Sequence, residues 1–266
     1  MKKFLSTTVI IQTQNETKYL DLTLQSLIVQ SFHPSNFEVI VLVESDNEEI
    51  KRVVSFYKNL LKIDICVGEN CKNDYLNKSK SDICLLVKSG IFLHKNCLEE
   101  HQKEHLKTSE KIVVVGYIQK AVSQNREVSK NLCNDFREEH YSRYDDRIDL
   151  LPAPWVFFSS SNVSISRTEL LMKDLHDENY DGDELYEDMD LGFRLCRSKN
   201  KMLLNRTASS IDYIPTDLNN SSKCRENQRN RFYFHGKYNT METKILKEIP
   251  SERVMYLNDH IIQFFE

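Results

Sequence analysis

Glycine is scarce in this chain, and its scarcity excludes two common phosphate-binding loops. The 266 residues contain six glycines: Gly68, Gly90, Gly116, Gly182, Gly192 and Gly236. None of them is spaced as in a P-loop or in the GxGxxG turn of dinucleotide-binding folds. A phosphorylated ligand must therefore be held by side-chain cations or through a metal ion, because no glycine-rich backbone cradle is present.

An excess of positive charge is also absent. The chain has 36 Lys and Arg residues against 40 Asp and Glu residues, which gives a formal net charge of -4. Nucleic-acid-binding domains are usually basic, at least along one face. Basic residues do gather at 225–237, but the acidic remainder of the chain argues against such a partner. We therefore expect no nucleic-acid partner.

Metal-binding cysteine pairs and long apolar runs are lacking as well. The 7 cysteines are an odd number, and no two have CxxC spacing, which disfavours zinc and thioredoxin-like sites. Several lie in apolar runs, as reduced core cysteines do. No stretch approaches the ~20 apolar residues of a membrane span. The apolar start at Phe4-Leu5 breaks at Ser6 without a cleavage site. We expect a cytoplasmic protein, with a peripheral position at the inner face of the membrane as the alternative.

Short apolar runs alternate with amphipathic segments in the first half of the chain. The apolar runs predict buried strands at 8–11, 37–43, 63–67 and 82–87. Apolar residues at helical spacing predict helices at 19–30, 48–61 and 98–106. This alternation indicates an α/β fold with a mostly parallel sheet covered on both faces. Ligands bind outside the carboxyl ends of such strands, where the chain has Thr13, Glu44 and Lys88-Ser89.

The second half of the chain is less regular. Further strands are predicted at 112–117, 159–166 and 201–207, and a helix at 223–238 is followed by a tail with helical character. Residues 119–149 are polar and poorly periodic, which predicts a mobile or partly helical loop over a site. Because no repeat or Pro/Gly linker is present, one domain with a C-terminal appendage is the best division.

An acidic stretch at 186–195 organises this second half. Apolar residues recur in it at helical spacing and predict a helix, on whose surface Asp190 and Arg194 can pair. Glu187 and Asp188 lie near its first turn, where free N–H groups and the helix dipole favour carboxylates. One interpretation is that they cap the N-terminus of the helix. The other is that the helix end holds one of the carboxylates at a cleft, where it acts as a general base.

The order of these motifs resembles that of family 2 glycosyltransferases of the GT-A type. The family's first strand is similar to Val9-Ile10-Ile11-Gln12-Thr13. The family's acidic helix signature is similar to residues 186–195. Other similar segments lie between these two, at 20–30, 37–41, 82–86, 100–116 and 162–165. The resemblance covers roughly residues 6 to 215, and the ordered set is far more specific than any single motif.

The resemblance implies a GT-A fold, which is a nucleotide-diphospho-sugar transferase-like α/β domain with a mostly parallel sheet flanked by helices. Residues 1–215 are expected to form this domain, with a nucleotide-sugar-binding half at 1–117 and an acceptor half at 118–215. Residues 216–266 are expected to form a C-terminal helical extension, or tail.

The activity implied by the resemblance is inverting transfer of a sugar from a nucleotide-sugar. A UDP-sugar is the expected donor, and the acceptor is a glycan, a lipid-linked molecule or a peptide. The aromatic and basic segment 231–237 is either a packed terminal helix or a contact to the donor diphosphate, the acceptor or a membrane surface. The aromatic tail beyond it is a candidate interface for a homo-oligomer.

The same resemblance implies roles for individual residues. It makes Asp188 the base that takes the acceptor's proton, with Glu187 in support or in contact with the acceptor. Nucleotide-sugar contacts fall on positions at or near the strand ends: Thr13, Glu44, Asn73, Lys88 and Ser89. Trp155 and Asn162 fall on the sugar or acceptor side.

The chain departs from the family pattern where the family binds a metal ion. The DXD carboxylates that hold Mn²⁺ or Mg²⁺ are replaced by Val87-Lys88-Ser89, and a later metal-binding histidine by Asp212. Valine cannot ligate a hard cation, yet a leaving diphosphate needs its charge stabilised. One hypothesis is a metal-independent transferase, in which Lys88 and cations from 223–237 replace the metal. The other is a catalytically inactive GT-A-like binding or scaffolding protein.

Several of these residues also have plain structural explanations. Lys88 can be a solvated residue at a strand end, and Glu44 can be a helix cap. Trp155 can be an ordinary core residue instead of a platform for a sugar ring. His101 and His105 have metal-ligand spacing on a helix, but no third ligand is evident, so solvated surface positions are favoured.

Overall fold

A computed structural model describes residues 4–13, 16–68, 76, 79–124, 127–172, 177, 179–180, 184–214 and 221–265. The strands are β1 (Thr7–Gln12), β2 (Phe37–Val43), β3 (Ile63–Val67), β4 (Ile83–Lys88), β5 (Ile91–Leu93), β6 (Ile112–Gln124), β7 (Glu127–Cys133), β8 (Asn162–Ser166) and β9 (Lys201–Asp212). The helices are α1 (Thr17–Ile28), α2 (Glu48–Tyr57), α4 (Cys97–Lys107), α5 (Glu138–Arg143), α6 (Arg167–Leu171), α7 (Glu184–Arg197), α8 (Ser221–Tyr238), α9 (Met241–Glu248) and α10 (Leu257–Phe265). Short 3₁₀ turns are η1 (Pro34–Asn36), η2 (Ile148–Leu150), η3 (Pro154–Phe157) and η4 (Ser251–Tyr256).

These strands form one sheet with the order β3-β2-β1-β4-β8-β6-β9-β5, and β7 pairs with β6. Strands β3, β2, β1 and β4 are parallel neighbours, which confirms the predicted parallel sheet. Strand β8 lies antiparallel between β4 and β6, with Asn162 opposite Val87. The segment that precedes β8 is therefore brought to the carboxyl end of β4, next to the sheet edge where ligands are expected.

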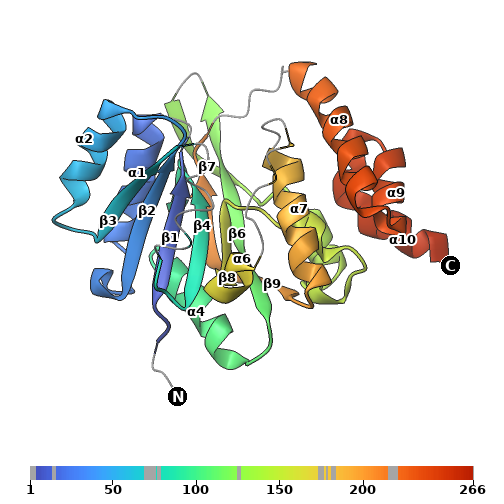
Figure 1. Cartoon of the computed structure of the whole chain (residues 1–266), viewed down its shortest axis with the longest axis horizontal. Helices are drawn as coiled ribbons and strands as arrows, with labels where there is room; N and C mark the ends of the chain where they lie inside the picture. Colours follow the sequence, from blue (N-terminus) through green and yellow to red (C-terminus); the bar gives the residue numbers. More distant parts are fainter. Residues whose placement is uncertain are drawn as a thin grey trace.

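Helices cover both faces of the sheet, because alternate residues of its strands face two separate cores (Figure 1). In β1, Val9 and Ile11 pack in a core that also contains Leu20 of α1. Ile10, which points to the opposite face, packs in a second core with Met189 of α7. This arrangement confirms the prediction of strands that are apolar on both faces.

Residues 119–149 are more regular than the sequence predicts. Strand β6 runs on to Gln124, and β7 returns antiparallel to it before α5 begins at Glu138. The prediction of a mobile or partly helical loop is therefore wrong for the hairpin and right only for the short helix. The hairpin escaped prediction because β7, with the sequence EVSKNLC, has few apolar residues to mark a strand.

The C-terminal helices pack against α7, and Figure 1 shows α7 between the sheet and helices α8, α9 and α10. Each of these three helices contributes a buried residue to the core that contains Met189 of α7: Phe234, Leu246 and Ile261. The helical extension is therefore joined to the sheet by a continuous core, and the division into donor and acceptor halves stays a prediction. None of the helices within the described ranges has the length and hydropathy that a membrane span needs.

Candidate active site

Lys88 and Asp188 meet at the carboxyl end of the parallel strands. Lys88 is the last residue of β4, and its Nζ lies 3.4 Å from Oδ2 of Asp188 in α7. The same carboxylate oxygen accepts a 3.1 Å hydrogen bond from the backbone N–H of Ser160. Only 14% of the Lys88 side chain and 9% of the Asp188 side chain is exposed. The edge at which ligands were expected thus carries an ammonium and a carboxylate side by side.

Gly192 allows α7 to lie close to the segment that holds Ser160. A Cβ atom at Gly192 would come within 2.8 Å of Phe158 Cβ and 3.0 Å of the Trp155 carbonyl oxygen. Asp188 precedes Gly192 by about one helical turn, so both lie on the same face of α7. The close approach at Gly192 therefore brings Asp188 to Ser160.

Asp188 does not cap the helix. Because α7 begins at Glu184, Asp188 lies in its second turn, beyond the free N–H groups of the first turn. The backbone group that it binds, the N–H of Ser160, comes from outside the helix. The capping interpretation is therefore wrong for Asp188. Glu187 beside it is half-buried, and its supporting role stays a prediction.

Thr13 and Ser89 are buried where β1 and β4 end. Thr13 is 3% exposed, and its Oγ1 has no hydrogen-bond partner among the described residues. The Ser89 N–H donates to the carbonyl oxygen of Gln12 at 2.8 Å, which joins the two strand ends. A buried hydroxyl without a partner is costly, so Thr13 is a position where a bound ligand would supply a missing hydrogen bond.

Glu44 follows β2 and is exposed at the same edge. The helix cap interpretation of Glu44 is wrong, because the N-cap of α2 is Asn47. The Asn47 side-chain oxygen accepts hydrogen bonds from the backbone N–H groups of Glu49 and Ile50. Asn73, the remaining position expected to contact a nucleotide-sugar, lies outside the described residues.

Trp155 and Asn162 lie in the interior, and their expected places on the sugar or acceptor side are corrected. Trp155 is 2% exposed, and its ring centroid lies 5.4 Å from those of both Phe193 and Phe234. Asn162 is fully buried, and its Nδ2 donates to the carbonyl oxygen of Ala208 at 2.9 Å. The Trp155 ring is packed among aromatic rings, and the Asn162 amide is held by a buried hydrogen bond. Neither side chain therefore presents a surface to a sugar.

His101 is buried and His105 is half-buried, so the prediction of solvated surface positions is wrong for His101. His101 is 1% exposed, and its ring nitrogens lie 2.9 Å from Asn162 Oδ1 and from Ser164 Oγ. His105 contacts the same Ser164 hydroxyl at 2.9 Å. Burial lowers the pKa of both histidines to about 4, so both are neutral at pH 7. Within the described ranges, no group of three or more His, Cys, Asp or Glu residues is placed to hold a metal ion.

The positions that match the family's metal ligands do not suit a divalent cation. Val87 is 1% exposed and belongs to the apolar core, while Lys88 places a positive charge at the strand end. Asp212 is paired with Lys120, whose Nζ lies 2.6 Å from its Oδ2. The side chains of Val87 and Lys88 cannot ligate Mn²⁺ or Mg²⁺, and the Asp212 carboxylate is paired with an ammonium, so these three positions do not fit such an ion.

The aromatic and basic segment 231–237 is a packed terminal helix. Lys237 Nζ lies 2.7 Å from Oδ1 of Asp190, and Arg231 is buried with hydrogen bonds to neighbouring hydroxyl groups. Asp190 is itself 1% exposed, so its predicted pair with Arg194 forms at 2.7 Å in the interior and not on the helix surface. The charged groups of Arg231 and Lys237 are engaged within the protein and are not placed to bind a donor diphosphate.

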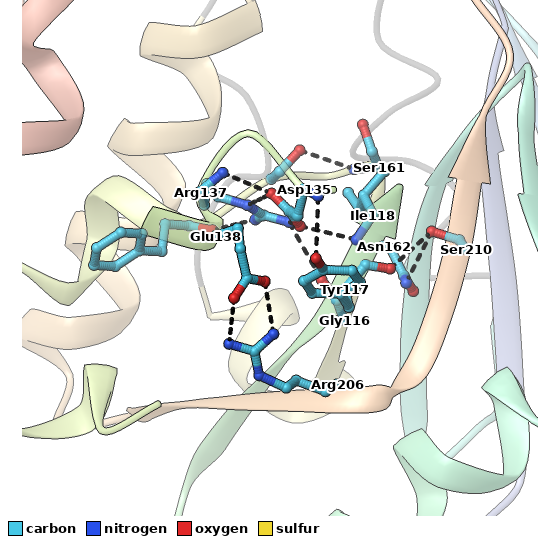
Figure 2. Close-up of polar contacts among 12 residues, drawn as sticks. Gly116, Tyr117, Ile118, Asp135, Arg137, Glu138, Ser161, Asn162, Arg206 and Ser210 are labelled. Carbon is cyan, nitrogen blue, oxygen red and sulfur yellow. Dashed lines mark hydrogen bonds and ion pairs between the residues drawn. The ribbon is translucent and has the colours of Figure 1, made fainter. Parts of the chain in front are cut away.

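A buried ion pair beside the site was not predicted from the sequence. Arg137 is 1% exposed, and its Nη2 lies 2.6 Å from Oδ2 of Asp135 (Figure 2). Its Nη1 donates a 2.8 Å hydrogen bond to the carbonyl oxygen of Phe157. The only signal in the sequence is the short spacing of an acid and a base, which is too common to mark a buried pair.

No family model matches the chain. Validoxylamine A glucosyltransferase of Streptomyces hygroscopicus subsp. limoneus is 22% identical over 230 residues, which cover 77% of this chain and 51% of that protein. Poly(ribitol-phosphate) beta-N-acetylglucosaminyltransferase TarS of Staphylococcus aureus is 28% identical over 107 residues, which cover 38% of this chain and 18% of TarS. The chain thus spans 51% or less of the length of these two relatives.

Two solved structures match nearly the whole chain. Staphylococcus aureus TarS in complex with UDP-GlcNAc has a TM-score of 0.64 and 15% identity, over 97% of this chain and 71% of that chain. The mannosyltransferase PcManGT from Pyrobaculum calidifontis, in complex with GDP-Man and Mn²⁺, has a TM-score of 0.66 and 12% identity. The match covers 97% of this chain and 70% of the PcManGT chain. The chain therefore has the GT-A glycosyltransferase fold that its ordered motifs implied.

Proposed function

We propose that this protein is a glycosyltransferase that moves a sugar from a nucleotide-sugar to an acceptor hydroxyl, with inversion and without a divalent cation. One observation carries the proposal: Asp188 and Lys88 lie side by side at the carboxyl end of the parallel strands. The transferase names of the relatives and the nucleotide-sugars in the similar structures support it.

The donor is proposed to lie along the ends of β1, β2 and β4. Thr13 has a buried hydroxyl without a partner among the described residues, so it can bond the nucleoside. Glu44 is exposed at the same edge and offers a carboxylate to ribose hydroxyls. Ser89 and Asn73 complete the proposed set. We expect a UDP-sugar because TarS binds UDP-GlcNAc in its structure.

In the proposed step, the acceptor hydroxyl attacks the anomeric carbon of the donor. Asp188 takes the hydroxyl proton as the new C–O bond forms, and the bond to the diphosphate breaks. The nucleoside diphosphate leaves with the electron pair of that bond. Lys88 stabilises the negative charge that develops on it. An ammonium has three N–H donors, so Lys88 can contact Asp188 and a phosphate oxygen together.

The partners of the site are proposed from the resemblance. The acceptor is a glycan, a lipid-linked molecule or a peptide, and a homo-oligomer and a cytoplasmic or peripheral membrane location stay predictions. Residues 118–215 are proposed to supply the acceptor site, and the burial of Trp155 and Asn162 does not support a role for these two residues in it.

Calorimetry and a donor-turnover assay test the proposal. UDP, UDP-GlcNAc and GDP-mannose are titrated in excess EDTA, and release of the nucleoside diphosphate is then followed with candidate acceptors. We expect binding and turnover to persist in EDTA. Asp188→Asn should abolish turnover while leaving nucleotide binding and folding intact. Lys88→Met should lower turnover by on the order of 10²–10³-fold, as loss of one charge-stabilising group does.

Lys201→Met is the matched control, because Lys201 is exposed and pairs only with the surface residue Glu110 in the described contacts. It should leave turnover unchanged. Activity that is lost in EDTA and restored by Mn²⁺ or Mg²⁺ would overturn metal independence. Tight donor binding without turnover for every acceptor would favour the inactive binding protein, an alternative that the missing metal ligands support.

A further inference from the structure

Asp135 and Arg137 form an ion pair that is fully removed from solvent. Only 1% of the Arg137 side chain and none of the Asp135 side chain is exposed. Arg137 donates from Nε to Asp135 Oδ1 at 2.8 Å and from Nη2 to Oδ2 at 2.6 Å. Buried pairs of this kind often contribute less to stability than apolar residues of similar volume. The presence of this pair therefore calls for an explanation beyond stability.

The pair joins three segments that are distant in the chain. Arg137 Nη1 donates to the Phe157 carbonyl oxygen at 2.8 Å. Its Nη2 also donates to the Gly116 carbonyl oxygen at 3.3 Å. Asp135 Oδ2 accepts from the backbone N–H of Ile118 at 2.8 Å. Figure 2 shows Arg137 and Asp135 in contact with this part of β6. The guanidinium thus fixes the 157–160 segment relative to the sheet.

The 157–160 segment ends at the backbone group that holds Asp188. Phe157 accepts from Arg137, and Ser160, three residues later, donates its N–H to Asp188 Oδ2 at 3.1 Å. Burial acts to lower the pKa of Arg137, but the negative charges of Asp135 and, more weakly, Asp188 hold it above its ordinary value. Arg137 and Asp188 are therefore coupled both through the backbone and through their charges.

We propose that the Asp135–Arg137 pair is a positioning element of the active site, which holds the 157–160 segment so that the Ser160 N–H orients Asp188. The inference rests on the proposed role of Asp188 as the base. With only 1% of its side chain exposed, Arg137 is not placed to touch substrate. It acts on the reaction through Phe157 and Ser160.

Arg137→Lys tests the inference, because it keeps the charge beside Asp135 but cannot bond Asp135 and Phe157 with one planar fork. We expect turnover to fall by on the order of 10²-fold, as small displacements of a catalytic group do. The Kd for UDP should stay within about twofold of the wild type, since Arg137 is buried and is not one of the proposed donor contacts. Hydrogen exchange of the Ser160 amide should become faster.

Arg206→Lys is the matched control. Arg206 is 36% exposed and makes forked pairs with Glu138, the residue after Arg137, and with Asp146, but it has no hydrogen bond to the 157–160 segment among the described contacts (Figure 2). This change should leave turnover and Ser160 exchange unchanged. If Arg137→Lys fails to fold, Asp135→Asn replaces it, since it keeps the side-chain shape and the guanidinium. Asp135→Asn should also lower turnover, as expected for Arg137→Lys.

The outcomes separate the inference from the proposed function. Arg137→Lys with wild-type turnover, beside an inactive Asp188→Asn, overturns the positioning role and leaves the base in place. An equal loss in Arg137→Lys and Arg206→Lys also overturns it, since a general loss of stability would then explain both. If Asp188→Asn stays active, the proposed base is wrong. The exchange of the Ser160 amide still tests whether the pair holds the segment.

Discussion

At the scale of single residues, Lys88 and Asp188 are separated by 100 positions in the chain and by 3.4 Å in space. A buried ammonium or carboxylate is costly alone and less costly as a pair with further hydrogen bonds, such as the one from Ser160. The pair therefore places a proton acceptor and a positive charge at the sheet edge before any ligand binds. Such prior placement is what lets a site stabilise a transition state without reorganising.

Thr13 gives a residue-scale prediction that separates stability from binding. Its buried hydroxyl has no partner among the described residues, so Thr13→Val should leave the free energy of unfolding unchanged or raise it by up to about 1 kcal/mol. The same change should weaken UDP binding by roughly tenfold, since one hydrogen bond to the ligand is lost. Urea denaturation and calorimetry measure the two effects.

Thr23→Val provides the contrast for this prediction. The Thr23 hydroxyl donates to the Tyr19 carbonyl oxygen at 3.2 Å and accepts from the Gly90 N–H at 2.9 Å. Its removal should destabilise the fold by about 1 kcal/mol, because both hydrogen bonds of this buried hydroxyl are lost while the Gly90 N–H keeps its 3.0 Å bond to the Tyr19 carbonyl oxygen. A Thr13→Val protein as destabilised as Thr23→Val would show that the Thr13 hydroxyl is already bonded in the free protein.

At the scale of elements, α7 presents acidic residues on opposite faces. Asp188 and Asp190 are two residues apart, which corresponds to about 200° of rotation around the helix. Asp188 faces the site, where it meets Lys88 and Ser160. Asp190 faces α8, where it accepts hydrogen bonds from Lys237 at 2.7 Å and from the Tyr238 hydroxyl at 2.6 Å. One helix therefore supplies the proposed base and anchors the C-terminal extension.

Asp190→Asn is predicted to loosen the extension. The change removes the charge that balances Lys237 and Arg194 in a site where Asp190 is 1% exposed. We expect a loss of about 1.5–3 kcal/mol in the free energy of unfolding, because charged hydrogen bonds are weakened while Lys237 keeps its ion pair with Asp177 at 2.8 Å. Hydrogen exchange in α8 should increase. Guanidinium denaturation and exchange measurements test both effects.

The control for Asp190 is Glu110→Gln, which breaks an exposed pair with Lys201. Exposed pairs contribute about 0–1 kcal/mol, so this variant should unfold almost as the wild type does. If Asp190→Asn behaves like Glu110→Gln, the cluster around Asp190 does not hold α8 in place, and apolar contacts such as those of Phe234 are sufficient.

At the scale of the whole molecule, a buried polar network joins α4 to the middle of the sheet. His101 contacts Asn162 and Ser164 of β8, and His105 contacts the same Ser164. Asn162 continues the network to the Ser210 hydroxyl of β9 at 3.1 Å. The network depends on neutral histidines, because a protonated ring in this buried place would carry an uncompensated charge. Its integrity therefore depends on pH.

Stability is predicted to fall as the pH drops from about 6.5 to about 4. The pKa of His101 and His105 is about 4 in the folded protein, against an ordinary 6.5. Between these values the unfolded chain binds more protons than the folded one, so acid favours unfolding. From pH 7 to pH 5 we expect a loss of about 2 kcal/mol for each histidine. Urea denaturation at several pH values measures it.

His101→Gln tests the origin of this pH dependence. Glutamine can bond Asn162 and Ser164 but does not titrate, so the variant should lose about 2 kcal/mol of the acid destabilisation between pH 7 and pH 5. A profile that is unchanged in His101→Gln would assign the acid sensitivity to other groups.

The sequence by itself determined the features that depend on local pattern. Apolar runs predicted the four parallel strands, because a strand buried on both faces must be apolar throughout. Helical spacing predicted α1, α2 and α4 to within a few residues at each end, and composition predicted α8. The ordered motifs pointed to the GT-A fold and to Asp188, since they preserve the positions at which strands end and the acidic helix begins.

Only the tertiary structure decided which side chains meet. Periodicity shows that a residue lies on a helix or strand face, but it does not show which distant segment covers that face. The sequence therefore placed Trp155 and Asn162 at a site and His101 at the surface. Neighbouring segments bury all three side chains. For the same reason, the sequence did not reveal the contact of Lys88 with Asp188. That contact exists because β8 pairs antiparallel with β4 and because Gly192 lets α7 approach.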